Sequence, residues 1–142
     1  MIPAFETATG YLPPGEHLAD WQEFSTRFGG NRVRDRLLGG ILRMGQSLRQ
    51  AGCTFFLIDG SFVTDRETPN DFDACCDFSG INIAKTDLRL FGTRAEMKAE
   101  FFGELFPEQY QADDRYTFRE FFQTDRDGVA KGIVRLQLET LP

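Results

Sequence analysis

Histidine and cysteine are scarce in this chain of 142 residues, which has one His and three Cys. His17 has no Cys or Asp at the spacing of a zinc site, so nothing in the sequence indicates a zinc centre. The cysteines are odd in number, and neighbours such as Cys75 and Cys76 cannot face one partner from a strand. The sequence therefore indicates no disulfide framework and favours a reduced, cytoplasmic setting.

Long apolar runs and excess positive charge are also missing. The longest apolar run, at Phe55–Ile58, has the size of a strand and is far shorter than a membrane span. The N-terminus lacks the basic and apolar pattern of a signal peptide. A net charge of −6 argues against broad, non-specific binding of nucleic acid, although residues 27–50 carry six Arg and one Asp. We therefore expect no membrane association.

The overall amino-acid composition is that of a globular domain. Apolar residues make up 41% of the chain, and fifteen Phe give the expected core an aromatic bias. Residues 1–15 contain three prolines and no helical period, so we expect an extended N-terminal arm there. Residues 16–142 are then expected to form one domain.

Hydrophobic periodicity predicts four helices and three strands. Asn31 is the predicted N-cap of the second helix, and Thr117 with Glu120 forms a capping box for the last. Residues 79–92 show no decisive pattern, and 118–123 has a hairpin arm as its alternative. The predicted helices are 16–28, 31–50, 93–106 and 118–123, and the predicted strands are 53–59, 71–77 and 133–139. This order indicates an α/β (α+β) fold with a small mixed β-sheet flanked by helices.

The most informative motif is Gly60-Ser61 separated by nine residues from Asp71-Phe72-Asp73. Side chains alternate along a strand, so Asp71 and Asp73 are expected on one face and Phe72 in the core. Two neighbouring carboxylates repel each other unless a proton or a cation lies between them, and hard oxygen ligands suit Mg²⁺ or Mn²⁺. Gly60 allows close approach of a ligand to the backbone, and Ser61 offers polar groups to a phosphate.

This combination resembles the minimal nucleotidyltransferase pattern of the DNA polymerase beta superfamily, over residues 55–76. A wider similarity, nearly end to end, is to short uncharacterised bacterial proteins of nucleotidyltransferase-like type. It rests on the opening Ile2–Phe5 and Leu12–Gly15 runs, on the Gly60–Asp73 run, on Gly103–Pro107 and on Lys131–Val134. The resemblance implies transfer of a nucleoside monophosphate from a nucleoside triphosphate to an RNA or protein hydroxyl. Small members of the superfamily often act in toxin–antitoxin or defence pairs, so a partner protein or homo-oligomer is also implied.

Residue roles follow from the resemblance. Asp71 and Asp73 are expected to bind the metal that grips the triphosphate, and Gly60 and Ser61 to cradle its terminal phosphates. Arg66, in the excursion above the motif, is a candidate phosphate contact. Two bound metals would serve the attacking and leaving oxygens.

The third carboxylate of the pattern is where this sequence departs from it. The expected position on the last strand is Gln137, and an amide is a poor ligand for Mg²⁺ and no general base. Glu139 is two residues further on, hence on the same face of a strand, and is the candidate substitute.

Two other interpretations stay open. The chain could keep the fold and bind a nucleotide or partner protein without catalysis, or it could be a purely structural subunit. Asp71 and Asp73 could also be a turn acid and a solvated strand face, and the arginines of 27–50 could be a solvated helix face.

Overall fold

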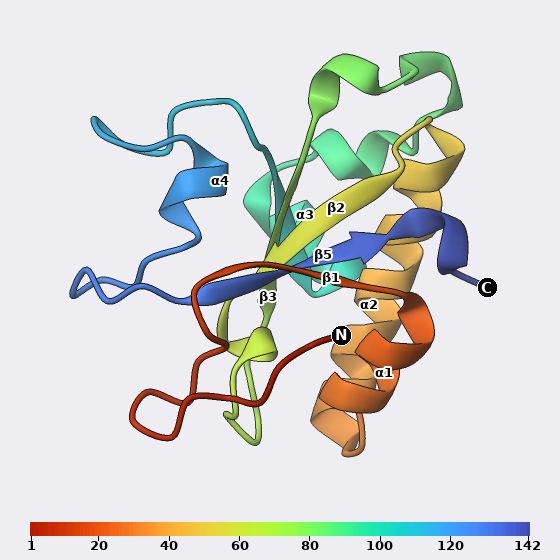
Figure 1. Cartoon of the computed structure of the whole chain (residues 1–142). Coiled ribbons are helices and arrows are strands. Elements are labelled where there is room, and N and C mark those ends of the chain that lie inside the picture. The colour runs from red at the N-terminus through yellow and green to blue at the C-terminus, as the bar shows by residue number, and fades with distance from the viewer.

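A five-stranded mixed sheet forms the centre of the molecule, as a computed structural model of residues 1–142 shows (Figure 1). Its spatial order is β1-β5-β2-β3-β4. β1 runs parallel to β5 and β3 parallel to β4, whereas β2 is antiparallel to both of its neighbours. The strands are β1 (Gly15–Ala19), β2 (Phe55–Asp59), β3 (Phe72–Cys76), β4 (Gly103–Pro107) and β5 (Gly132–Gln137). The predicted mixed sheet flanked by helices is confirmed.

Four helices accompany the sheet, and each has a side-chain N-cap. They are α1 (Trp21–Phe28), α2 (Arg32–Gln50), α3 (Arg94–Phe101) and α4 (Phe118–Phe121). Asn31 caps α2 by accepting the N–H of Arg34, and Thr117 with Glu120 forms the capping box of α4. Each side-chain acceptor satisfies an N–H that the first helical turn would otherwise leave unpaired.

One face of the sheet carries the main hydrophobic core. Alternate residues of β2, β3 and β5 point to this face and are completely buried, among them Phe56, Ile58, Phe72 and Val134. They pack with buried side chains of α1, α2 and α3, so these three helices cover this face, while α4 lies on the other side of the sheet (Figure 1). The core cluster contains 25 buried residues.

The structure corrects the first predicted helix. Residues 16–18 belong to β1 and pair with Ile133–Arg135 of β5, and the helix begins only at Trp21. Its start is set by Asp20, whose carboxylate accepts the N–H of Glu23. Leu18 fitted the helical spacing of apolar residues by coincidence, since it lies on the edge strand and is half exposed.

The structure also corrects the helix predicted for 93–106. α3 ends at Phe101, because Phe102 adopts a left-handed conformation with φ of 66°. Gly103 then begins β4, where an added Cβ would lie 2.5 Å from the carbonyl oxygen of Phe72. Only glycine permits this approach of β4 to β3. The Phe and Leu residues that extended the helical pattern belong to a strand instead.

The remaining segments are short turns and an ordered N-terminal stretch. Residues 78–80, 83–85 and 88–91 form 3₁₀ turns in the region whose pattern was undecided. The last strand ends at Gln137, two residues earlier than predicted, and 138–140 is again a 3₁₀ turn. Ile2 and Leu12 are buried, so the segment before β1 is anchored to the domain. No helix is long and apolar enough to span a membrane.

Candidate functional site

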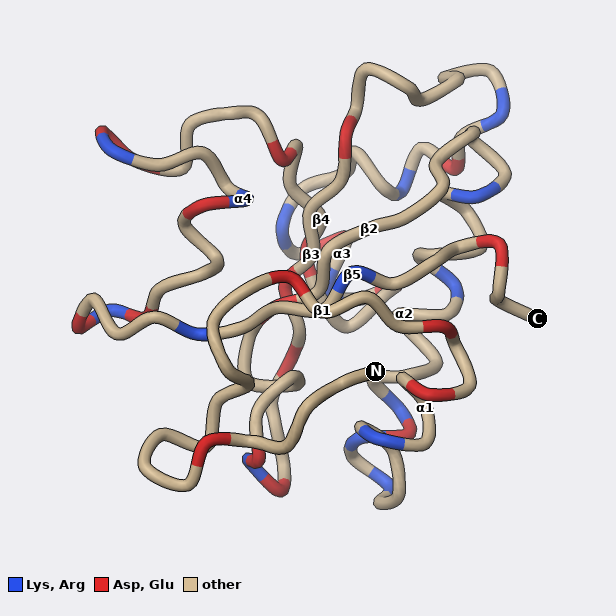
Figure 2. Tube along the Cα trace, viewed as in Figure 1, with Lys and Arg blue, Asp and Glu red and all other residues tan.

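Three acidic side chains lie in register across three neighbouring strands. Asp59 of β2 is paired with Asp73 of β3, and Asp73 is paired with Glu104 of β4. Residues opposite one another share a face, and neighbouring strands lie about 4.8 Å apart, so these residues form an acidic row across the sheet. The row lies on the face opposite the main core, and acidic segments gather where β2, β3 and β4 meet (Figure 2).

Asp73 is at the middle of the acidic row and is its only member without a cation within ion-pair distance. Burial, followed by the negative charges of Asp59, Asp71 and Glu104, raises the pKa of Asp73 to about 7, against a smaller opposite effect of Lys98. A carboxyl group with this pKa is about half ionised at neutral pH. A cation that binds here would therefore replace a proton.

Asp59 ends β2 and is only 3% exposed. The Nζ of Lys131 is 3.1 Å from Oδ1 and 3.2 Å from Oδ2 of Asp59, and only the contact with Oδ2 has hydrogen-bond geometry. Burial raises the pKa of Asp59 despite Lys131 and a hydrogen bond from the backbone of Gly60. Two neighbouring carboxyls, Asp59 and Asp73, thus both resist ionisation.

Cations of α3 hold the other end of the row. The Nζ of Lys98 is 2.8 Å from Asp71 Oδ2 and 3.5 Å from Glu104 Oε1, and Arg94 Nε is 2.7 Å from the same Glu104 oxygen. Asp71 precedes β3 and is bound to Lys98, whereas Asp73 lies beside Gly60. The structure therefore does not leave Asp71 and Asp73 as the open pair that their spacing predicted.

The turn after β2 brings Gly60 and Ser61 to Asp73. Gly60 has φ of 91°, and an added Cβ would be 3.3 Å from the backbone nitrogen and 3.6 Å from Oδ2 of Asp73. Glycine is needed here for the conformation and for the close approach. Ser61 begins a 3₁₀ turn, Ser61–Val63. The predicted neighbourhood of Gly60, Ser61 and Asp73 is therefore present in the structure.

Arg34 of α2 holds the loop that follows this turn. Arg34 is 8% exposed, and its guanidinium donates hydrogen bonds to the carbonyl oxygens of Phe28, Phe62, Thr64 and Arg66. No carboxylate pairs with it, and burial lowers its pKa. The planar fork of five donors suits this task, which lysine could not perform. Arg66 itself is exposed.

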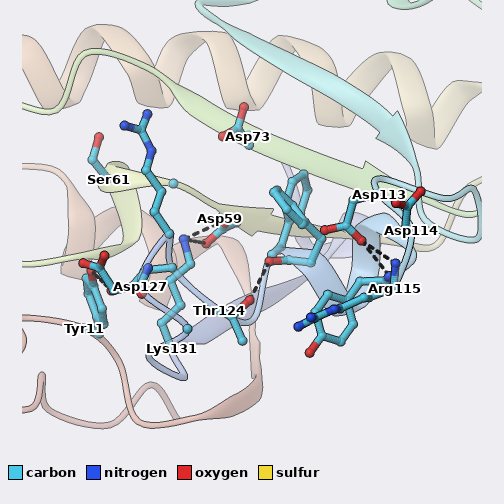
Figure 3. Close-up of a pocket in the computed structure, with 17 residues that line it drawn as sticks. Tyr11, Asp59, Ser61, Asp73, Asp113, Asp114, Arg115, Thr124, Asp127 and Lys131 are labelled. Atoms are coloured by element: carbon cyan, nitrogen blue, oxygen red, sulfur yellow. Dashed lines mark hydrogen bonds and ion pairs between the residues drawn. The ribbon is translucent and has the colours of Figure 1, made fainter.

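A cavity of about 1100 Å³ lies in front of Asp59, Gly60, Ser61 and Asp73 (Figure 3). Small-molecule sites usually measure about 300–1,000 Å³, so there is room for a nucleotide-sized ligand. Only four of its 17 lining residues are hydrophobic. The others include three cations, Arg115, Arg126 and Lys131, and six aspartates, namely Asp59, Asp73, Asp113, Asp114, Asp125 and Asp127. The lining therefore suits a charged, polar ligand. Neither Asp71 nor Arg66 lines this cavity.

The far wall of the cavity is formed by the arm, which we define as residues 108–131 and which includes α4. The arm is fixed to the sheet by Arg119, whose Nε is 2.6 Å from Glu16 Oε2 and whose Nη2 is 2.8 Å from Glu16 Oε1. Phe118 stacks on Phe106 of β4 with ring centroids 4.5 Å apart. Phe122 packs with Leu57, Cys75 and Ile133 in a small hydrophobic cluster under the arm.

Glu139 and Gln137 lie at the opposite end of the sheet from the acidic row. β5 is antiparallel to β2, so Gln137 pairs with Phe55 at the start of β2, whereas Asp59 is at its end. Four residues of strand separate the two positions, or about 13 Å. Glu139 is exposed in the turn 138–140. Glu139 is therefore not brought to Asp73. The presence of Gln rather than an acid at position 137 does not affect the composition of the acidic row.

Comparison with known proteins gives one family. Residues 3–137 match a family described as "Family of unknown function (DUF6932)". The chain belongs to this family. No curated protein and no solved structure matches it.

Sequence reasoning missed two members of the acidic row in this DUF6932 chain. Asp59 stands directly before Gly60-Ser61, where it looked like a strand end. Glu104 was hidden by the helix predicted for 93–106, although Gly103 before it is a helix-breaking signal. Lys131, which precedes β5, had no local signal, because its contact with Asp59 joins residues 72 positions apart.

Proposed function

We propose that this protein is a metal-dependent nucleotidyltransferase of the DNA polymerase beta type, acting from the cavity beside Asp73. The observation that carries the proposal is the acidic row of Asp59, Asp73 and Glu104, which directly adjoins the Gly60-Ser61 turn. The fold class supports it as well, since the mixed sheet presents two members of the row, Asp59 and Asp73, at an open cavity.

The residues fit a divalent cation in donor chemistry. Carboxylate oxygens are the ligands that Mg²⁺ and Mn²⁺ prefer, and Asp73 is a carboxyl whose surroundings disfavour its charge unless a cation is near. No three His, Cys, Asp or Glu side chains are arranged to hold an ion on their own. Mg²⁺ is commonly bound by one or two carboxylates together with substrate phosphates and water, so Asp73 with one neighbour is sufficient.

In this proposal each residue of the site has its own role. Asp73 would hold the metal, together with Asp71 once Lys98 has released it, and the metal would supply neutralisation of the phosphate charge. Gly60 and Ser61 contact the terminal phosphates. Glu104, which lies beside Asp73 but does not line the cavity, replaces Glu139 as the third carboxylate and accepts the proton of the acceptor hydroxyl. This requires that Arg94 and Lys98 both leave its Oε1. The hydroxyl oxygen then bonds to the α-phosphorus, and pyrophosphate leaves.

The acceptor is proposed to be an RNA or protein hydroxyl. A partner protein or second copy would help to bind it, as expected for one half of a toxin–antitoxin or defence pair. The arginines of α2 offer little to an RNA acceptor. Arg36 and Arg43 lie over the ring of Phe102, with guanidinium carbons 4.1 and 5.3 Å from its centroid, so two of them already have packing roles.

The test is transfer of label from each nucleoside triphosphate, with Mg²⁺ or Mn²⁺, to RNA and protein acceptors. We expect transfer by the wild type, loss in Asp73→Asn and a large decrease in Glu104→Gln. Glu139→Gln and Gln137→Asp are matched controls at the far end of the sheet and should leave the rate unchanged. Loss of activity in Glu139→Gln with a normal rate in Glu104→Gln would contradict this assignment of the third acid.

The alternative function is a binding module without catalysis, and one observation favours it. All three carboxylates near Asp73 are already paired with cations: Asp59 with Lys131, Asp71 with Lys98, and Glu104 with Arg94. A site committed to such pairs can bind a nucleotide or partner without activating a hydroxyl. Binding of a triphosphate with no transfer to any acceptor would favour this function.

A further inference from the structure

Lys131 is the cation that lies deepest in the cavity. The chain has three lysines, of which Lys85 is exposed and Lys98 is bound to Asp71 and Glu104. The side chain of Lys131 is 16% exposed and lines the cavity together with Gly60, Ser61 and Asp73 (Figure 3). The other two cations of the lining, Arg115 and Arg126, are exposed residues of the arm.

The backbone around Lys131 is fixed on both sides. Its N–H donates to the carbonyl oxygen of Gln123, and the N–H of the next residue, Gly132, donates to that of Leu12, both at 2.9 Å. A Cβ at Gly132 would be 2.1 Å from the carbonyl oxygen of Pro13, so the chain passes here at close range. The backbone of Lys131 is therefore held in one position, directly before the start of β5 and beside the end of β2.

Stability does not explain the pair of Lys131 with Asp59. Burying an ion pair removes both charges from water, and the attraction commonly does no more than offset that penalty. The geometry is also incomplete, because Asp59 Oδ1 has no hydrogen bond. An ammonium group with three donors, held at a single good hydrogen bond and facing a polar cavity, retains the capacity to bind a further anion.

We propose that Lys131 binds the phosphate tail of a nucleoside triphosphate in this cavity, and that Asp59 is the counter-ion that positions it. The inference rests on the proposed function for its ligand class. Lysine is a common phosphate ligand and acts as a point charge. The Gly60-Ser61 turn directly follows Asp59, so Lys131 and this turn lie at the same end of β2 and line the same cavity. Asp59 then has no role as a metal ligand.

The first experiment measures binding of ATP and of inorganic tripolyphosphate by calorimetry, with and without Mn²⁺. In Lys131→Met, which keeps the length and loses the charge, we expect both ligands to bind at least tenfold more weakly. Lys131→Arg should retain most of the affinity. Lys85→Met removes an exposed lysine outside the cavity and should bind like the wild type. Asp59→Asn keeps the lysine but loses its counter-ion, so an intermediate loss is expected for a positioning residue.

The second experiment uses the wild type, so it does not depend on a variant that folds. Pyridoxal phosphate, an aldehyde that carries a phosphate, is reacted with the protein and the imine is reduced with borohydride. With three lysines, mass spectrometry assigns each site of labelling. We expect ATP to protect Lys131 and to leave Lys85 labelled as before.

The outcomes separate this inference from the proposed function. Unchanged affinity in Lys131→Met, or labelling of Lys131 that ATP does not reduce, overturns the role of Lys131 even where transfer activity is found. Loss of affinity in Lys131→Met without any transfer by the wild type supports the role and removes the catalytic proposal. Failure of the wild type to bind either ligand overturns the inference.

Discussion

The two faces of the sheet differ in almost every physical property, although the same strands supply both. On the face covered by α1, α2 and α3, the strand side chains join a core of 25 buried residues. On the other face, only four buried residues form a hydrophobic cluster, and the rest of the surface carries the acidic row, its cations and the cavity. Neighbours in sequence, such as Ile58 and Asp59, thus belong to different environments.

The comparison shows that most of the stabilising apolar burial lies on one face of the sheet, which leaves the other face for a polar site. A strand with a period of two can place an apolar residue against helices and the next residue in a polar site, without any change of backbone. Phe72 and Asp73 on β3 repeat the arrangement of Ile58 and Asp59 on β2. Burial raises the pKa values of Asp59 and Asp73 on this face, so ionising them there costs free energy that burial on the core face offsets.

The largest expected effect distinguishes the two faces directly. Ile58 and Leu57 are adjacent on β2, both completely buried, and point to opposite faces. Ile58→Ala should lower the free energy of unfolding by about 2–5 kcal/mol, since the large core cannot close around the lost volume. Leu57→Ala should cost clearly less, because the small cluster lies under an arm that can settle onto it. Urea unfolding of both variants measures the difference, and an equal or larger loss in Leu57→Ala would break the comparison.

A second prediction concerns the charge of Asp73. Its pKa of about 7 lies above the unfolded value of 3.8, so the folded state binds the proton more tightly. The stabilising contribution of the protonated group is complete below pH 4 and is lost as pH rises through 7. Asp73→Asn removes this loss, so the variant should be more stable than the wild type at pH 8. The upper bound is about 4 kcal/mol, at about 1.4 kcal/mol per pKa unit.

Unfolding in urea between pH 4 and pH 8 measures this effect. Near pH 4 the wild type and Asp73→Asn should be similar in stability, and the variant should show a flatter decline with increasing pH. Some decline should persist, because burial also raises the pKa of Asp59. Asp114→Asn, an exposed residue of the same cavity, is the control and should follow the wild type. If the variant is less stable than the wild type at pH 8, ionisation of Asp73 in the folded protein costs little free energy and the prediction is wrong.

The core face was largely predictable from sequence, whereas the cavity face was not. The caps Asn31 and Thr117 and the strands around Phe56 and Phe72 follow from local pattern, which the structure reproduces. The site was predictable only where its members are near in sequence, as for Gly60, Ser61 and Asp73.

Its other members depend on register and topology. Glu104 reaches Asp73 because α3 ends at the left-handed Phe102, and Glu139 lies far away because β5 is antiparallel to β2. Neither the end of α3 nor the direction of β5 produces a periodic pattern that can be recognised in a single sequence. Which side chains meet across neighbouring strands depends on which strands pair and in what register. The boundary between α3 and β4 was missed because the helical spacing of apolar residues in 93–106 continues into the strand.

The smallest predicted effect concerns how the arm is held on the cavity face. Arg119 joins the arm to Glu16 of β1 by two hydrogen bonds, and its side chain is 39% exposed. Because such a partly exposed pair contributes little, Arg119→Gln should lower global stability by about 1 kcal/mol or less. The local effect should be larger: amide hydrogens of residues 108–131 should exchange faster, while those of α2 and β2 stay unchanged. Arg89→Gln, which removes an exposed pair with Asp87 and Glu100, is the matched control and should leave exchange of the arm unaltered. Unchanged exchange of the arm in Arg119→Gln would mean that the stacking of Phe118 on Phe106 holds it without the ion pair, and the cavity wall would then depend on the same apolar packing as the opposite face.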